Sequence, residues 1–277
     1  MKYKVIDNFL DENSCNQLIN EAEKFAKNEH IKVLNERQLL PSTSFAFINL
    51  VKKSQAWSSL QRKLNSSEFL NLLTGSLDIK DTEFKITNFF YNLNPSTFLK
   101  RYKDLNSKKI SMIGNINLIF YLSYKFYRSL IRFLKYKFRN KDYVELLYDY
   151  SKSPNGYKRE IHRDSDSRTI VFLLYLNKLS DQGEGGDLEL YKYNNNQDKI
   201  PSRPKESDCT LIERVTPKSG RLVTFVNSHD SLHAVSEMKN HNGYRHFLYG
   251  SFTLLGKKNK LLVNSSGSLS TNFSIFD

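Results

Sequence analysis

Residues 159–177 read REIHRDSDSRTIVFLLYLN, a stretch that joins a charged segment directly to an apolar one. His162 and Asp164 stand one residue apart, just before the run 168–177, which is apolar enough for a buried strand. Because a lone charge is costly to bury, these side chains either belong to a solvated turn or point at a partner or metal. In a strand that continues through both positions they would face the same side and converge, as a metal pair needs.

Strand-like runs continue on both sides of this stretch. Runs rich in Val, Ile, Leu, Phe and Tyr, separated by turn residues, predict strands over 143–150, 168–177, 187–193, 221–227 and 244–254. Many short strands of this kind are typical of a β-sandwich or barrel. Upstream, the sequence predicts strands over 3–10 and 84–93 and helices over 11–28, 57–64 and 68–73. A polar loop is expected over 194–208.

Length and composition favour one elaborated globular domain. The chain has 277 residues, of which 39% are hydrophobic and 26% charged, so global disorder is excluded. Two cysteines, Cys15 and Cys209, are too few for a disulfide framework and suit a reducing compartment. The N-terminus lacks the apolar stretch of a secretory signal, and no run has the apolar length needed to cross a bilayer. We therefore expect a soluble, cytoplasmic protein.

The net charge of +13 is concentrated in one segment. Residues 97–141 contain twelve Lys or Arg against a single acid, Asp104. Within this insert, 115–141 predicts an amphipathic helix, because its basic residues step by three and four along one face. Such a helix suits peripheral contact with anionic lipid, or RNA binding, but more often it covers the protein's own sheet with a solvated basic face.

A metal site needs a third ligand, and five other histidines are available. His30 lies far upstream in a polar stretch and is set aside. His233 is the best placed, because it follows the strand expected at 221–227 and opens the short apolar run HAV. His229, in the polar turn before it, is the rival. Two histidines and one carboxylate leave coordination positions open, which is the arrangement of non-haem Fe(II) oxygenases.

An arginine is out of place in the apolar run 244–254, yet Arg245 stands there. Directed into a barrel, it would pair in a bidentate manner with the carboxylate of a bound molecule. His246, its neighbour in the strand, would face the other side. Arg163 and Arg168 are expected to be surface charges or strand-end ion pairs, with a role at the rim of a site as the alternative. Gly185–Gly186 are expected to form a turn without a chemical role.

The ordered set His162-Arg-Asp164, His233-Ala-Val and Arg245 resembles the prolyl 4-hydroxylase-like branch of the Fe(II)/2-oxoglutarate dioxygenases. The connecting stretches RTIVFLLYLN, GEGGDLELY and VTPKSGRLVTFVNS agree with that branch. So do VIDNFLDENSCNQLI at the N-terminus and EFLNLLTG at 68–75, which look like its helical lead-in. The resemblance covers most of the chain except 97–141 and the tail.

The resemblance implies an α+β, mainly β fold: a double-stranded β-helix (jelly-roll) core with N-terminal helices packed on the major sheet. It divides the chain into a support region of helices and strands with the basic insert (1–142), the dioxygenase core (143–256) and a polar tail (257–277).

The resemblance also implies a ligand set. His162, Asp164 and His233 would bind Fe(II), and 2-oxoglutarate, the cosubstrate, would bind the iron and place its far carboxylate on Arg245. O2 is the other cosubstrate, and ascorbate is a candidate reductant. Tyr150 matches the neighbourhood of a family tyrosine that helps to hold 2-oxoglutarate, although the stretch from Tyr150 to His162 is longer than usual.

The implied activity is hydroxylation of a C–H bond, with decarboxylation of 2-oxoglutarate to succinate. The substrate would be a peptidyl proline, an amino acid or another small molecule, and the oligomeric state is left open. One alternative, a demethylase of alkylated nucleic acid, is motivated by the basic segment 97–141. A second alternative is a non-catalytic jelly-roll module tethered to a membrane or partner through 115–141.

Overall fold

The computed structural model describes residues 1–26, 32–34, 36–42, 44–79, 85–87, 143–165, 168–179, 183–194, 200–254, 261–263 and 269–271. The basic segment 97–141, with the helix predicted at 115–141, lies outside the described residues, as does His30. Among the described helices, none is both long enough and apolar enough to span a bilayer.

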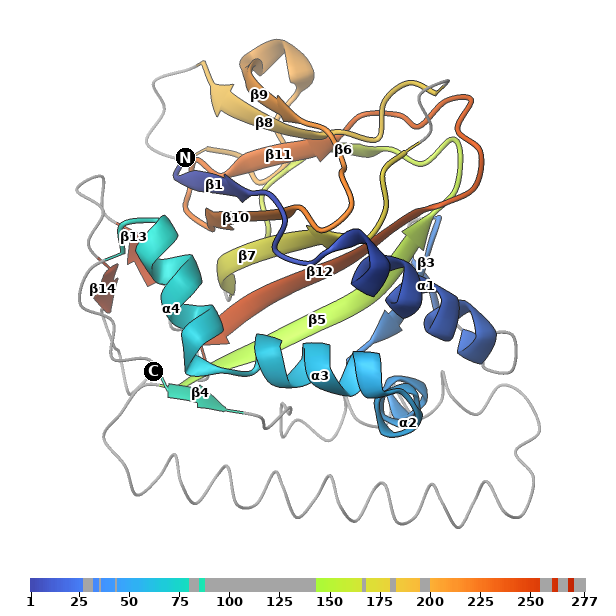
Figure 1. Ribbon diagram of the computed structural model, residues 1–277. Helices are drawn as coiled ribbons and strands as arrows, with labels where there is room; N and C mark the ends of the chain where they lie inside the picture. Colours follow the sequence, from blue (N-terminus) through green and yellow to red (C-terminus); the bar gives the residue numbers. More distant parts are fainter. Residues whose placement is uncertain are drawn as a thin grey trace, which may run out of the picture.

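Two β-sheets lie face to face (Figure 1). The larger sheet has the strand order β1-β10-β7-β12-β5-β3-β2, and β4 pairs in parallel with β5. Its strands are β1 (Tyr3–Ile6), β2 (Lys32–Leu34), β3 (Arg37–Pro41), β4 (Lys85–Thr87), β5 (Tyr143–Ser153), β7 (Arg168–Tyr175), β10 (Leu222–Val226) and β12 (Arg245–Leu254). The smaller sheet, of order β6-β11-β8-β9, contains β6 (Arg159–His162), β8 (Leu188–Tyr193), β9 (Cys209–Val215) and β11 (Leu232–Val235). A separate hairpin joins β13 (Leu261–Val263) to β14 (Leu269–Thr271).

The chain passes back and forth between the two sheets. From β5 to β12, the strands β5, β7, β10 and β12 belong to the larger sheet, and β6, β8, β9 and β11 to the smaller one. All pairings within these two sets are antiparallel. This winding is that of a double-stranded β-helix, or jelly roll, so the predicted fold is confirmed.

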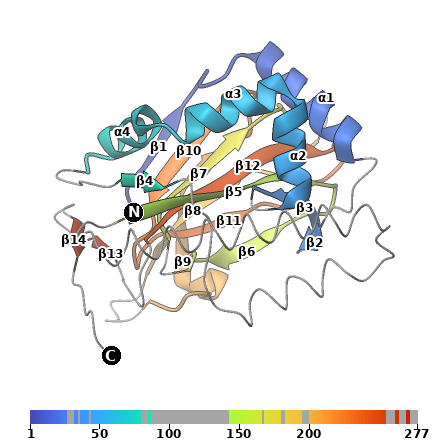
Figure 2. The ribbon, with the colours of Figure 1, turned by 90° about the horizontal axis from the view of Figure 1, so that it is seen from below.

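In the described part of the chain, four helices cover the outer face of the larger sheet (Figures 1 and 2): α1 (Glu12–Ala26), α2 (Phe45–Lys53), α3 (Gln55–Leu64) and α4 (Ser67–Ser76). The hydroxyls of Ser44, Ser54 and Ser66 accept hydrogen bonds from backbone N–H groups in the first turns of α2, α3 and α4. Such side-chain caps satisfy donors that a helix leaves free at its start, and they explain how three short helices follow one another so closely. Asp11 caps α1 in the same way, through a 2.8 Å bond from the Ser14 N–H to its Oδ1.

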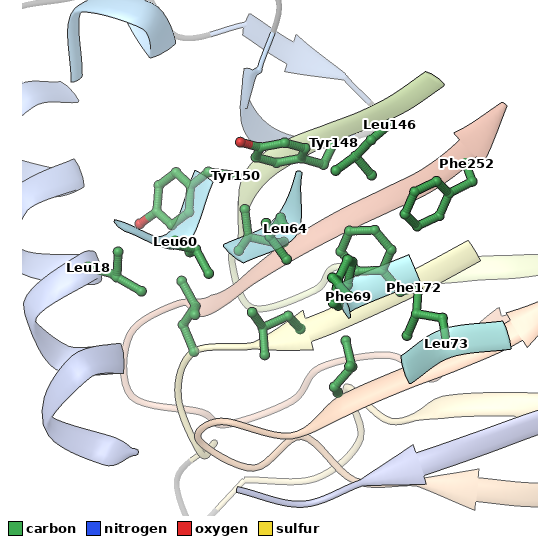
Figure 3. Packing of buried hydrophobic residues seen from close by; sticks show 14 of the residues in the cluster. Leu18, Leu60, Leu64, Phe69, Leu73, Leu146, Tyr148, Tyr150, Phe172 and Phe252 are labelled. Carbon is green, nitrogen blue, oxygen red and sulfur yellow. The ribbon is translucent and has the colours of Figure 1, made fainter. Parts of the chain in front are cut away.

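Strand β7 shows why residues 170–176 are continuously apolar. Val171, Leu173 and Tyr175 lie in a cluster between the two sheets, whereas Ile170, Phe172 and Leu174 lie in the cluster under the helices. Figure 3 shows Phe172 in that second cluster, beside Phe69 and Phe252. A strand covered on both faces has no polar side, so it lacks the usual alternation. Side chains of β12 also point alternately to the two faces, both of them apolar: Phe247 faces the smaller sheet and Leu248 faces the helices.

Gly250 in β12 makes room for an aromatic ring of the helix-covered core. It pairs with Phe172, and a Cβ at this position would lie 2.2 Å from the ring carbon Cζ of Phe172. We predict that Gly250→Ala lowers the free energy of unfolding by about 1–3 kcal/mol, because overpacking forces the ring from its place. Urea denaturation measures the change.

Gly75 in α4 supplies the matched control. A Cβ there meets nothing within 4 Å, so Gly75→Ala should leave the stability unchanged or raise it by up to about 1 kcal/mol. Equal destabilisation by the two substitutions would contradict the packing argument.

Candidate metal centre and anion site

Two neighbouring strands of the smaller sheet carry the residues singled out in the sequence. His162 is the last residue of β6, Asp164 follows in the turn, and His233 lies in β11 directly opposite His162. One potential ligand atom from each of the three residues lies within 4.8 Å of the others. The structure therefore brings this triad together, although β6 ends before Asp164 and the turn, rather than a continued strand, carries the carboxylate.

Backbone carbonyls orient both imidazole rings. Nδ1 of His162 lies 2.8 Å from the carbonyl oxygen of Glu160, and Nδ1 of His233 lies 3.1 Å from that of Ser231. A carbonyl only accepts, so Nδ1 donates, and in the neutral ring Nε2 keeps its lone pair. Burial, followed by the nearby His233, lowers the pKa of His162 to about 4, so this ring is neutral at physiological pH. Both Nε2 atoms are thus prepared to bind a cation.

Asp164 is held as an anion by two donors. Its Oδ1 accepts a 2.6 Å bond from Nη1 of Arg168, and its Oδ2 accepts a 2.6 Å bond from the Tyr249 hydroxyl. Burial raises the pKa of Asp164, but the nearby His233, Arg168 and the Tyr249 hydrogen bond outweigh it, and the pKa lies below its usual range. Two imidazole nitrogens and one ionised carboxylate are the donor set that fits Fe(II) with open coordination positions.

Asn227, just after β10, links the segments that carry the triad. Its Nδ2 donates to the carbonyl oxygens of Ser165 at 2.8 Å and Arg168 at 3.0 Å, and its Oδ1 accepts from the Ser231 hydroxyl at 3.1 Å. The turn containing Asp164 is thereby joined to the turn that leads into His233. The side chain is 6% exposed, so these bonds are protected from water.

A buried cation lies at the start of β12. Arg245 is 1% exposed, and its Nη1 donates to the Gly186 carbonyl. Its guanidinium carbon lies 4.6 Å from the ring centroid of Phe247 and 5.5 Å from that of Tyr157. Within the described part of the chain, Arg245 forms no ion pair and its Nε has no hydrogen-bond partner. Burial lowers the pKa of Arg245.

Three hydroxyl groups near Arg245 are in the same situation as its Nε atom. In the described residues, the hydroxyls of Ser151, Ser153 and Tyr175 are buried without a hydrogen-bond partner. Ser153 pairs with Arg245 across the strands, and Ser151 and Tyr175 both pair with Phe247, so all of them belong to the inner face of the larger sheet. Because buried polar groups are normally paired, this set of donors around a buried cation fits the carboxylate of a ligand.

Tyr150 does not belong to this set. It pairs with Leu248, so it faces the helices rather than the smaller sheet, and Figure 3 shows it close to Leu60. Its hydroxyl is hydrogen-bonded to Nδ1 of His246 at 2.8 Å and to Glu23 of α1 at 3.3 Å. The expectation that Tyr150 helps to hold 2-oxoglutarate is therefore not supported, since its neighbour Ser151 has the inward position. Tyr175, which lies on the inner face near Arg245, is not singled out by the sequence analysis.

The remaining candidates have other contacts. His229 lies apart from the triad, and its Nδ1 is 2.6 Å from Nη1 of Arg163 in exposed loops. His246 faces the helices, as its position next to Arg245 predicted. Gly185 and Gly186 have φ values of 75° and 78°, in the left-handed region that favours glycine. The Gly186 carbonyl accepts a hydrogen bond from Arg245. The sequence predicted only a turn at Gly185–Gly186, without this contact.

Comparison with known proteins agrees with this geometry. Residues 146–252 match the sequence model of the 2OG-Fe(II) oxygenase superfamily. No curated protein matches the sequence.

The fold is similar to solved prolyl hydroxylases. It is similar to a prolyl-4-hydroxylase from Pseudomonas putida, with 15% identity, a TM-score of 0.42, and coverage of 92% of this chain and 94% of that one. It is also similar to a prolyl 4-hydroxylase from Phytophthora capsici, with 17% identity, a TM-score of 0.47, and coverage of 96% of this chain and 64% of that one. A third similar structure is a prolyl hydroxylase from Trichoplax adhaerens, solved with a peptide fragment of a hypoxia inducible factor. The identity is 12%, the TM-score is 0.44, and the coverage is 91% of this chain and 83% of that one. At such identities and TM-scores, the likeness does not carry the substrates of these enzymes over to this chain.

Removing the Asn227 amide should weaken the framework of the triad. Asn227→Ala leaves the carbonyls of Ser165 and Arg168 each short of a donor, and we predict that it lowers the free energy of unfolding by about 1–3 kcal/mol. Thermal or urea unfolding of the metal-free protein measures the loss.

Asn65, which donates to the Gln61 carbonyl at the end of α3, provides a comparison site away from the triad. Because that bond is local and half-buried, Asn65→Ala should have the smaller effect. An Asn227→Ala protein as stable as the wild type would refute the linking role.

Proposed function

We propose that this protein is an Fe(II)- and 2-oxoglutarate-dependent oxygenase, a proposal supported by the match of residues 146–252 to the sequence model of the 2OG-Fe(II) oxygenase superfamily. In this proposal it hydroxylates a C–H bond of its substrate while 2-oxoglutarate is decarboxylated to succinate. The observation that carries the proposal is the triad of half-buried His162 and buried Asp164 and His233, whose ligand atoms lie within 4.8 Å of one another.

The triad would hold the iron, and the bound iron, with O2 and 2-oxoglutarate, supplies the oxidising chemistry. The chain's own residues orient and protect this centre. The carbonyls of Glu160 and Ser231 keep the two Nε2 atoms directed at it. The ring of Phe225 lies 4.9 Å from that of His233 and helps to exclude water on the inner side. Ordered ligands in a dry environment need little rearrangement when a cation binds.

Arg245 would take the far carboxylate of 2-oxoglutarate. A buried guanidinium without a carboxylate partner in the described residues is costly, and a bound dianion supplies the missing charge. The Tyr175, Ser151 and Ser153 hydroxyls lie on the same inner face, and a carboxylate can accept from several donors at once. This environment supports an oxygenase over a non-catalytic binding module.

The prolyl 4-hydroxylase-like character rests on the sequence resemblance. A peptidyl proline or a small molecule as substrate, ascorbate as reductant and a cytoplasmic location stay predictions. The segment 97–141, which motivated nucleic-acid demethylation and membrane contact, lies outside the described residues. Succinate formation measured across peptide, amino-acid and oligonucleotide pools would identify the substrate class.

The triad assignment is tested by single substitutions. We predict that His162→Ala, Asp164→Ala and His233→Ala each abolish the succinate formed from 2-oxoglutarate in the presence of Fe(II), because two ligands do not hold the metal in place. His229→Ala, which removes the rival histidine, should keep wild-type turnover. Turnover retained in any triad variant, or lost in His229→Ala, would reject the assignment.

Arg245 is tested through the affinity for 2-oxoglutarate. A charge-assisted hydrogen bond contributes about 1.5–3 kcal/mol, so we predict that Arg245→Gln raises the KM for 2-oxoglutarate by about 10- to 100-fold. Arg214→Gln serves as the control, since Arg214 is an exposed arginine paired with Glu189. The role of Arg245 is wrong if both variants show the wild-type KM.

A further inference from the structure

Asp164 is bound by two side chains that the proposed chemistry does not by itself require. We infer that Tyr249 and Arg168 are positioning residues, which hold Asp164 so that one carboxylate oxygen serves the metal and the other is kept away from it. The inference rests on the proposed function, because it concerns the same metal centre.

The two oxygens of Asp164 have different surroundings. Oδ2 lies 3.8 Å from Nε2 of His233, a nitrogen that we assign to the metal, and it accepts the 2.6 Å bond from the Tyr249 hydroxyl. Oδ1 accepts the 2.6 Å bond from Nη1 of Arg168. Oδ2 is therefore directed at the histidine ligands, whereas Oδ1 is held by a cation.

The clamp is built from separate strands. Arg168 begins β7 and Tyr249 lies on the inner face of β12, while Asp164 belongs to the turn after β6. Nη1 of Arg168 also donates to the Tyr249 hydroxyl, and its guanidinium carbon lies 5.0 Å from the Tyr249 ring centroid. Arg37 of β3 lies 5.5 Å from the same centroid. The tyrosine ring is thus held by cation–π contacts with two arginines and cannot easily turn its hydroxyl away.

This arrangement affects the number of open coordination positions. A carboxylate binds a cation through one oxygen or through both. To bind through both, Asp164, whose side chain is only 7% exposed, would have to give up the bond from Oδ1 to the Arg168 guanidinium. Arg168 therefore favours binding through Oδ2 alone, which leaves a further position for the cosubstrate. Tyr249 fixes the direction of that oxygen.

Metal titration tests the inference without turnover. Isothermal titration calorimetry with Mn²⁺ would compare the full-length, metal-free wild type with Tyr249→Phe and Arg168→Gln. Loss of such supporting hydrogen bonds typically lowers metal affinity by about 10- to 100-fold, and we expect this loss in both variants. Arg168→Lys, which keeps a cationic donor, should recover part of it.

Two controls separate positioning from a purely structural role. Tyr148→Phe removes a buried hydroxyl in the helix-covered core, and it should keep wild-type affinity for Mn²⁺ (Figure 3). The thermal unfolding midpoint of metal-free Tyr249→Phe should stay near that of the wild type, because the ring and its cation–π contacts remain.

The possible outcomes are distinct. The inference is overturned if Tyr249→Phe and Arg168→Gln bind Mn²⁺ as tightly as the wild type, or if their loss of affinity simply follows a loss of metal-free stability. In either case the proposed function stands, provided that His233→Ala abolishes binding. If the wild type and His233→Ala bind Mn²⁺ equally weakly, the metal centre itself is wrong, and the proposed function fails with it.

Discussion

The register of β11 against β6 is the constraint on which the candidate site depends. It sets His233 opposite His162, and a slip of one residue would turn His233 to the other face of the sheet. Strand β11 has only four residues, but it is paired on both sides, with β6 and with β8. The Asn227 side chain adds a link between the turns at the same end. Backbone pairing thus places the two histidines of the triad, and the Asn227 side chain holds the turn that carries Asp164, before any metal is considered.

Burial on both faces of the larger sheet provides the second half of the site. Because helices cover the outside, consecutive residues of β5 and β12 enter two different apolar environments. Arg245 faces inward and His246 outward, and Ser151 and Tyr150 divide in the same way. A cation can occupy an inward position here only with aromatic rings, a carbonyl and unpaired hydroxyls around it. The helices, which contribute no ligand, therefore maintain the dry interior that gives these groups their effect.

The sequence was sufficient for features that depend on local pattern. Apolar runs marked the core strands, and the spacing of His162 and Asp164 before such a run marked the candidate metal pair. Strand phase is not accessible from the sequence: nothing in it states whether Tyr150 or Ser151 faces inward, or that Tyr175 shares the inner face with Arg245.

Other gaps have similar physical causes. The contacts of Asn227, Gly186 and Tyr249 join residues far apart in the chain, so no local signal marks them. Helix α2, FAFINLVKK, was missed because its many apolar residues obscure the helical period, and β9 because it is an exposed edge strand.

Charged side chains that are largely buried pair with a side chain of opposite charge in three places. Asp164 has Arg168, Lys152 has Glu23, and Arg221 has Asp7. Among the described residues, Arg245 is the most deeply buried arginine and has only neutral partners. A chain that keeps one such cation in its interior is stabilised whenever an anion of the right length binds beside it, because binding to the folded state alone shifts the folding equilibrium. In our proposal, ligand binding and fold stability are therefore coupled at Arg245.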